Sequence, residues 1–158
     1  MKLIETQVKK LYSGTDLDHY KTEGDTITVY LNSTKKSVVC PCCQTESHSV
    51  HSVYVKKFAD LPLNGMFTEC RLTNRIFTCR NKACEKKGGH FGATYDWINL
   101  EDHKTYRLIN RILDETLTNT VSGASKALAE AHIKADCRTI SRLKAAHGMR
   151  KSDMKDDE

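Results

Sequence analysis

The sequence Cys-Pro-Cys-Cys at residues 40–43 and the sequence Cys-Arg-Asn-Lys-Ala-Cys at residues 79–84 decide how this chain folds. Each supplies two thiols from one tight turn, Cys40 with Cys43 and Cys79 with Cys84. Two such turns, brought together by folding, form a tetrahedral four-thiolate site, the usual form of structural zinc. The spacing therefore predicts that these four cysteines bind Zn2+. An all-thiolate site leaves no position for water, so the predicted role is structural and not catalytic.

Other cysteines and a histidine leave alternatives for this site. Cys42 lies between the first two predicted ligands and can replace either of them, and His90 can approach the second pair. A redox role for the first cysteine group is the rival chemistry, but a thioredoxin-like pair should stand at a helix N-terminus, whereas an extended run follows here. Cys70 and Cys137 fall within a strand pattern and a helix pattern, and we interpret them as small apolar residues.

The segment between the two cysteine pairs predicts a β-hairpin. Residues 50–63 and 66–78 flank Asn64-Gly65, a dipeptide that favours a two-residue hairpin turn. A second hairpin is predicted upstream, because the residues after Gly24-Asp25 alternate between apolar and polar types. These hairpins predict a zinc-ribbon-like β region over residues 1–100. It is completed by a short helix over residues 4–12 and a last strand over residues 90–98.

The apolar period changes near residue 101 and becomes helical. Large apolar residues recur at three-to-four spacing from Leu108 to Leu117, and Ser122-Gly123 is predicted to break that helix. Two further helices are predicted over residues 124–131 and 137–146, the second with Asp136 as its N-cap. The predicted fold class is thus α+β, with a β region followed by a helical segment over residues 101–149. An acidic tail over residues 150–158 is expected to be disordered.

The last two predicted helices have the pattern of a helix-turn-helix, in which the second helix enters the major groove of DNA. Leu128, Ile140 and Leu143 are expected to face the core. Arg138, Thr139 and Arg142 then lie on or beside the outward face, where they are candidates for DNA contacts. The candidates for phosphate contacts in the β region are Lys56, Lys57, Arg71, Arg75, Arg80 and Lys82. The alternative is a plain three-helix packing element with a solvated basic face.

Composition agrees with a DNA-binding role without requiring it. The chain has 158 residues and a formal net charge of +5, and the excess lies within residues 51–150. Seven cysteines, no secretory pattern at residues 1–10 and no membrane-spanning run predict a cytoplasmic, nucleoid-associated protein with reduced thiols.

Several stretches together resemble one protein family. These are C-P-C-C at 40–43, V-H-S-V-Y-V-K-K-F-A-D-L-P-L at 50–63, R-I-F-T-C-R-N-K-A-C at 75–84 and S-G-A-S-K-A-L-A-E-A-H-I-K-A-D-C-R-T-I-S-R-L at 122–143. They are similar to the N-terminal zinc-binding and helix-turn-helix region of ISL-three family insertion-sequence transposases, over about residues 20–148. Departures are Gln44 where glycine is usual, Lys56 and Lys57 where arginines are common, and Gly92 where an acidic residue is frequent.

The resemblance implies zinc at the four cysteines and recognition of the terminal inverted repeats of a mobile element by double-stranded DNA binding. Members of the family continue into a ribonuclease-H-like catalytic domain, which this sequence lacks, so we expect no enzymatic activity. Asp156-Asp157-Glu158 cannot replace its carboxylates, which must converge from separate elements on two metal ions. Two alternatives remain: a zinc-ribbon module for protein–protein interaction or regulation, including assembly as a homodimer, and an enzyme fragment that needs a second chain.

Overall fold

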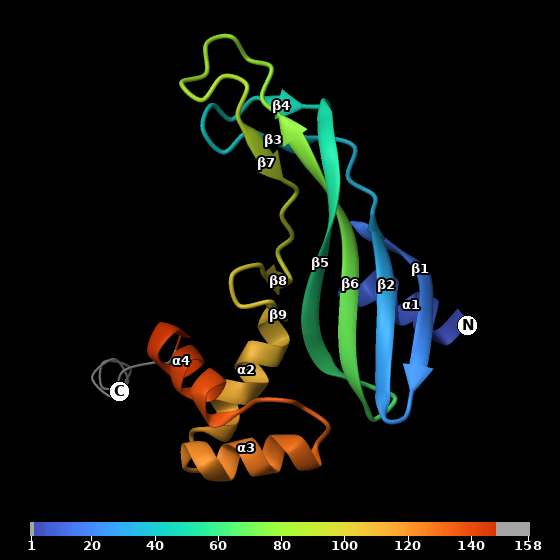
Figure 1. The fold of residues 1–158 in the computed structure, drawn as a ribbon, viewed down its shortest axis with the longest axis vertical. Helices are drawn as coiled ribbons and strands as arrows, with labels where there is room; N and C mark the ends of the chain where they lie inside the picture. Colours follow the sequence, from blue (N-terminus) through green and yellow to red (C-terminus); the bar gives the residue numbers. More distant parts are fainter. Residues whose placement is uncertain (1, 148–158) are drawn as a thin grey trace, which may run out of the picture.

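The computed structural model describes residues 2–147 as an α+β fold. A long mixed sheet carries a helical segment at one end and the two cysteine turns at the other (Figure 1). The predicted class is therefore confirmed. The predicted acidic tail, residues 150–158, lies outside the described residues.

The main sheet is built from two long hairpins. Its elements and those around it are α1 (Lys2–Leu11), β1 (Thr15–Glu23), β2 (Thr26–Ser33), β3 (Val38–Val39), β4 (Glu46–Ser47), β5 (Val50–Leu63), β6 (Met66–Thr78), β7 (His90–Gly92), β8 (Ile98–Asn99) and β9 (Lys104–Thr105). The strand order is β1-β2-β6-β5-β9-β8, β7 also pairs with β6, and β3 and β4 form a separate pair. The helical segment consists of α2 (Tyr106–Glu115), α3 (Val121–Glu130) and α4 (Cys137–His147).

Both predicted hairpins are confirmed, and the turn at Asn64-Gly65 has the positive φ values, 50° and 70°, that this dipeptide favours. The two hairpins join through β2 and β6, which run parallel with Leu31 opposite Leu72. A parallel pair needs a long crossover connection. Here the chain from β2 to β6 includes the first cysteine turn, so the topology carries that turn to the far end of the sheet.

One face of the sheet is covered and the other faces solvent. Ile27, Val29 and Leu31 alternate with less buried residues along β2 and are at most 1% exposed. They pack with Val8 and Tyr12 of the α1 region, which lies behind the sheet in Figure 1. Each such buried side chain contributes about 1.5–3 kcal/mol, so this inner face holds the main core.

The opposite, outer face carries a row of polar side chains. Tyr30 of β2 lies opposite Arg71 of β6, which lies opposite Lys57 of β5. His19 of β1 stacks on Tyr30 with ring centroids 4.1 Å apart. We call the side of the sheet that carries this row the outer face.

The helical segment has a core of its own. Leu108 and Ile112 of α2 pack with Leu128 of α3 and with Ile140 and Leu143 of α4, and all five are at most 1% exposed. This arrangement confirms the expected inward positions. Ala59 and Leu61 of β5 also pack against this core, so the helical segment is attached to the end of the second hairpin.

Two boundaries differ from the sequence-based expectation. Ser122-Gly123 does not end a helix but lies in the first turn of α3, whose N-cap Thr120 accepts a hydrogen bond from the Gly123 N–H. This N-cap hydrogen bond stabilises the first turn of α3, so Gly123 does not prevent the helix from forming there. The strand predicted over residues 90–98 is interrupted: β7 ends at Gly92, and the chain crosses the inner face, where Tyr95 and Trp97 pack against the core.

Candidate functional site

The four predicted cysteines converge at the far end of the sheet. The Sγ atoms of Cys40, Cys43, Cys79 and Cys84 all lie within 4.8 Å of one another, and those of Cys43 and Cys79 are 3.7 Å apart. A tetrahedron with metal–sulfur bonds of about 2.3 Å has edges of about 3.8 Å. All seven cysteines are free of disulfides. The cluster therefore has the size and the donor set to hold a metal ion.

The first pair stands in a turn between β3 and β4. The Gln44 N–H donates to the Cys40 carbonyl, and the Cys40 N–H donates to the Thr45 carbonyl, both at 2.9 Å. Gln44 has a φ of 61°, the left-handed conformation that glycine favours. This explains why glycine is usual at this position in the family that the sequence resembles.

The second pair stands in the loop between β6 and β7. The Cys79 N–H donates to the Gly89 carbonyl, and the Gly88 N–H donates back to the Cys79 carbonyl. A Cβ at Gly89 would lie 2.7 Å from the Lys86 carbonyl oxygen, a contact that backbone cannot relieve cheaply. Glycine at position 89 is therefore required to close the loop around Cys84.

Polar contacts brace the two cysteine turns against each other. Asn81 donates to the Thr45 hydroxyl across the cluster, and Ser47 donates to the Thr78 carbonyl at 2.5 Å. Hydrogen bonds from the Thr45 side chain and backbone lower the pKa of Cys43 to about 6, whereas burial raises the pKa of Cys84. The environment therefore favours the thiolate of Cys43, whereas metal binding must displace the proton of Cys84.

The alternative ligands stay outside this cluster. Cys42 is exposed, and His90 forms a hydrogen bond with the Thr78 hydroxyl at 3.1 Å. Among residues 2–147, the group that can hold a metal consists of the four predicted cysteines. Cys70 is buried, which confirms its interpretation as an apolar residue. The same interpretation is wrong for Cys137, which is exposed because it is the first residue of α4.

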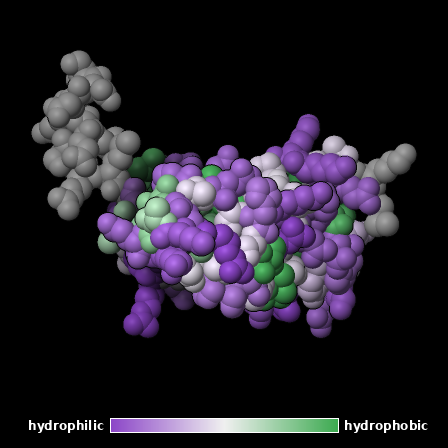
Figure 2. All heavy atoms as spheres, turned by 90° about the horizontal axis from the view of Figure 1, so that it is seen from above, coloured by the Kyte–Doolittle hydropathy of each residue, from purple (hydrophilic) through white to green (hydrophobic). Residues whose placement is uncertain are grey.

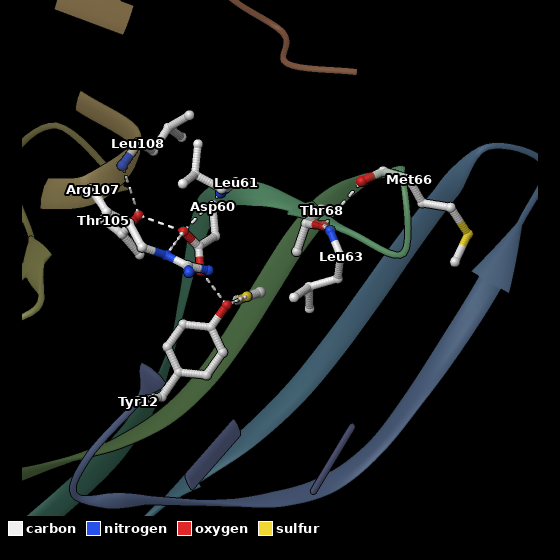
Figure 3. Close-up of polar contacts among 10 residues, drawn as sticks. Tyr12, Asp60, Leu61, Leu63, Met66, Thr68, Thr105, Arg107 and Leu108 are labelled. Atoms are coloured by element: carbon white, nitrogen blue, oxygen red, sulfur yellow. Dashed lines mark hydrogen bonds and ion pairs between the residues drawn. The ribbon is translucent and has the colours of Figure 1, made fainter. Parts of the chain in front are cut away.

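A buried carboxylate ties the helical segment to the sheet. Asp60, at the end of β5, accepts hydrogen bonds from Arg107 of α2, from the Thr105 hydroxyl at 2.6 Å and from the Tyr12 hydroxyl (Figure 3). Its side chain is 0% exposed. Burial, together with the nearby Cys70 and Asp60, raises the pKa of Tyr12 well above its ordinary value, so Tyr12 remains a donor. The Asp60 side chain thus connects β5 to Tyr12, which follows α1, and to the start of α2 at Thr105 and Arg107.

The local sequence explains why Asp60 is free for this role. Strand pairing between β5 and β6 is irregular between Asp60 and Leu63, and Pro62 has no N–H to donate. The Leu61 N–H turns back to the Asp60 carboxylate at 2.7 Å, and the Leu63 N–H donates to the Thr68 hydroxyl (Figure 3). The Asp-Leu-Pro sequence therefore interrupts the ladder, which resumes at Leu63, and leaves the carboxylate to face α2.

A second carboxylate holds α4. Asp102, between β8 and β9, accepts hydrogen bonds from Arg142 and from His147, the latter at 2.6 Å. Burial raises the pKa of Asp102, but the hydrogen bonds from His147 and Arg142 outweigh that effect, so its pKa lies below the ordinary value. Asp102 therefore restrains one side of the helix that was predicted to contact DNA.

The turn between α3 and α4 is defined by backbone hydrogen bonds. The Ile133 N–H donates to the Leu128 carbonyl at 2.8 Å, and the His132 N–H donates to the Ala129 carbonyl. These two bonds form a Schellman motif, with His132 in the left-handed conformation at φ 59°. The Ser125 hydroxyl also donates to the Ala135 carbonyl, so the whole turn is held against α3.

The start of α4 is capped as predicted. The Asp136 carboxylate accepts a hydrogen bond from the Thr139 N–H at 2.7 Å. That bond lowers the pKa of Asp136. Arg138 is exposed in the first turn, Thr139 is partly buried beside it, and Arg142 is exposed but paired with Asp102.

The other predicted phosphate-contact residues fall in different places. Lys57 and Arg71 lie side by side on the outer face, whereas Lys56 is paired with Leu72 and points to the opposite side of the strand. The remaining three lie toward the cysteine end: the Arg75 guanidinium donates to the Lys35 carbonyl, Arg80 donates to Ser49, and Lys82 is exposed. The structure therefore does not gather the six into one surface.

The cysteine end is mostly hydrophilic when seen from above, with hydrophobic residues only in small separate spots on the visible face (Figure 2). No helix within residues 2–147 is long and apolar enough to cross a membrane. No family model, no curated protein and no solved structure matches this chain.

Proposed function

We propose that this protein is a zinc-stabilised, sequence-specific DNA-binding protein in which α3 and α4 form a helix-turn-helix. The observation that carries the proposal is the arrangement of α4. Ile140 and Leu143 anchor it in the helical core, while Arg138 is exposed in its first turn. In a helix-turn-helix, the N-terminal residues of the second helix contact base edges in the major groove. The protein supplies no catalysis in this proposal.

Zinc is the metal that we propose for the four-cysteine cluster. Four thiolates at tetrahedral separation are its preferred structural donor set, and a site without an open position suits a structural ion. The β3–β4 pair is two residues long on each strand, too short to be stable alone. Zinc would therefore supply much of the free energy that orders this end of the sheet.

The resemblance to the end-recognition region of ISL-three transposases supports a target class: the terminal inverted repeats of a mobile element. The net charge of +5 agrees with a phosphate-bearing partner. Lys57 and Arg71 on the outer face are proposed phosphate contacts, which position the protein without specifying sequence.

The test is binding of zinc-loaded protein to the duplex that flanks its gene, compared with a scrambled duplex, across a salt series. We expect sequence-selective binding whose affinity falls steeply with salt, because DNA binding releases counterions. A chelator should abolish selectivity if the cysteine end orders the DNA-binding surface. Equal binding to both duplexes at every salt concentration would contradict sequence-specific recognition.

A second candidate is a module for protein–protein interaction, including assembly as a homodimer. Val53 and Val55 of β5 are 61% and 59% exposed, and within residues 2–147 the edge of β5 opposite β6 pairs only with β9, at Ala59. An open edge with apolar side chains can add a strand from a second chain. Self-association that is indifferent to salt and unaffected by DNA would favour this candidate.

A further inference from the structure

A cavity of about 290 Å³ lies where the outer face of the sheet meets the turn between α3 and α4. The sheet contributes Lys57 and Phe67 to its wall, and the turn contributes His132 and Lys134. We call this cavity the junction pocket. Leu108 of α2 and His103 of the β8–β9 turn also line it.

Together with the two arginines that pair with its carboxylates, the junction pocket has an excess of positive charge. Its two carboxylates are already engaged, because Asp60 pairs with Arg107 and Glu69 pairs with Arg71. Lys57 and Lys134 are exposed and have no carboxylate partner within residues 2–147. The two ammonium groups therefore favour an anionic ligand, and their flexible stems can adjust to it.

One wall of the pocket is aromatic. The rings of Phe67 and His132 have centroids 5.0 Å apart and an interplanar angle of 58°. The Lys134 Nζ atom lies 5.0 Å from the Phe67 centroid, within the range of a cation–π contact. Leu108 is 1% exposed and adds an apolar floor. A ligand with both a negative charge and a planar apolar surface would match these walls.

Two histidines of the pocket occupy backbone conformations that glycine favours. His103 has a φ of 53° and His132 a φ of 59°. His132 stands at the position of the Schellman motif that is usually glycine. Such a conformation costs a non-glycine residue free energy, and it persists at ligand-binding positions more often than elsewhere. Within residues 2–147 the other two non-glycine cases, Gln44 and Asn64, also stand in turns but do not line the pocket.

We propose that the junction pocket binds one unpaired nucleotide of a DNA strand. Its phosphate lies between Lys57 and Lys134, and its base lies against Phe67 and His132. Stacking on aromatic rings combined with lysine contacts to the backbone is how proteins hold single strands. A volume of about 290 Å³ is near the lower limit of small-ligand pockets and fits one nucleotide better than a larger group. The proposal rests on the proposed function for the choice of DNA as partner.

The test compares four probes on the zinc-loaded full chain: a blunt duplex, the same duplex with one unpaired thymidine, a short oligothymidylate and free thymidine monophosphate. The pocket variant is Lys57→Met with Lys134→Met. The matched control is Lys10→Met with Lys36→Met, which removes the same charge at exposed residues that do not line the pocket. Thermal melting of both variants checks that they fold.

We expect the pocket variant to bind the oligothymidylate at least about tenfold more weakly than the control variant. Its plot of log affinity against log salt should be shallower by about 0.7, because the one phosphate that lies between the two lysines contributes about 0.7 for a single strand. Phe67→Ala should weaken the same binding roughly 5- to 150-fold, the range for loss of one stacked base. The unpaired thymidine should raise duplex affinity in the wild type and not in the pocket variant.

Equal oligothymidylate affinities in the pocket and control variants would overturn the proposal. It would also be overturned if the unpaired thymidine left the duplex affinity of the wild type unchanged. Lysine-dependent binding of thymidine monophosphate without the oligothymidylate would also overturn it, because the ligand would then be a free nucleotide. Failure of the proposed function looks different. In that case the blunt duplex is bound without sequence preference, while the oligothymidylate still depends on Lys57 and Lys134.

Discussion

The buried carboxylate of Asp60 accepts two hydrogen bonds from the guanidinium of Arg107, at 2.8 Å from Nε and 2.5 Å from Nη2. Asp60 lies near the end of β5 and Arg107 lies in the first turn of α2, so this pair fixes the helical segment to the second hairpin. Bidentate pairs restrict orientation as well as distance. The junction pocket, whose walls come from both segments, depends on that fixed orientation.

Asp60→Asn should destabilise the protein by about 3–5 kcal/mol, because it leaves a partly buried arginine without its charge partner. The change preserves the size of the side chain, so lost packing does not contribute. Urea unfolding followed by circular dichroism measures the effect. Asp114→Asn is the matched control, since Asp114 is exposed on α2, and it should change the stability by less than about 0.5 kcal/mol. Equal effects of the two changes would show that the Asp60–Arg107 pair does not hold the segments together.

Cys43→Ser should reduce the zinc content from about one ion per chain to near zero, because a structural site needs all four thiolates. Cys42→Ser should leave the zinc content unchanged, since Cys42 is exposed and outside the cluster. Metal content after gel filtration, measured by atomic emission, distinguishes the two variants. The wild type treated with a chelator should resemble Cys43→Ser in its melting curve. Retention of zinc by Cys43→Ser would mean that Cys42 or another donor completes the site.

Local sequence chemistry predicted the parts of this fold that depend on neighbouring residues. Asn64-Gly65 specified a turn by its backbone preference, and the two cysteine pairs specified the cluster by their spacing. The parallel pairing of β2 with β6 could not be predicted this way. A period of two defines which face of a strand is buried but not which strand lies beside it.

The candidate site was predictable to the same degree. The cluster of four cysteines follows from the sequence, whereas the roles of Asp60 and Asp102 depend on partners more than 35 residues away. The Asp-Leu-Pro sequence at residues 60–62 is distinctive, but the sequence does not show that Asp60 binds Arg107, because the position of α2 depends on the whole fold. His132 gave no sequence pattern at all, because only the backbone shows that it occupies a position typical of glycine.

The two arginines of α4 should behave differently when changed. Arg138→Ala should weaken binding to the specific duplex by about 1–3 kcal/mol and blur sequence preference, with little effect on stability, because Arg138 is exposed. Arg142→Ala should affect both affinity and stability, because Arg142 also pairs with Asp102. Fluorescence anisotropy on specific and scrambled duplexes, together with thermal melting, separates the effects. Lys10→Ala provides the control for a general loss of charge. Wild-type affinity in both arginine variants would exclude α4 as the DNA-contacting helix.

Acid should loosen α4 through Asp102. The pKa of this carboxyl is lower in the folded protein than its ordinary value, so its hydrogen bonds stabilise the fold at pH values above the unfolded pKa, which is about 3.9. That contribution is lost as the pH falls through the still lower folded pKa, so the relevant window begins near pH 4 and extends downward. Asp102→Asn cannot ionise and should lack this part of the pH dependence, with a stability deficit of about 1 kcal/mol near neutral pH.

The measurement is the difference in unfolding free energy between wild type and Asp102→Asn from neutral pH to about pH 3, the region where ordinary carboxyls titrate. The difference isolates Asp102, because acid also protonates the cysteine thiolates in both proteins and releases any bound metal. We expect the stability deficit of Asp102→Asn to shrink as the pH falls, since the wild type loses the contribution of the ionised Asp102 carboxylate, which the variant lacks at every pH. A deficit that stays constant would show that the hydrogen bonds from Arg142 and His147 do not depend on the charge of Asp102, and acid would then not loosen α4 through this carboxyl.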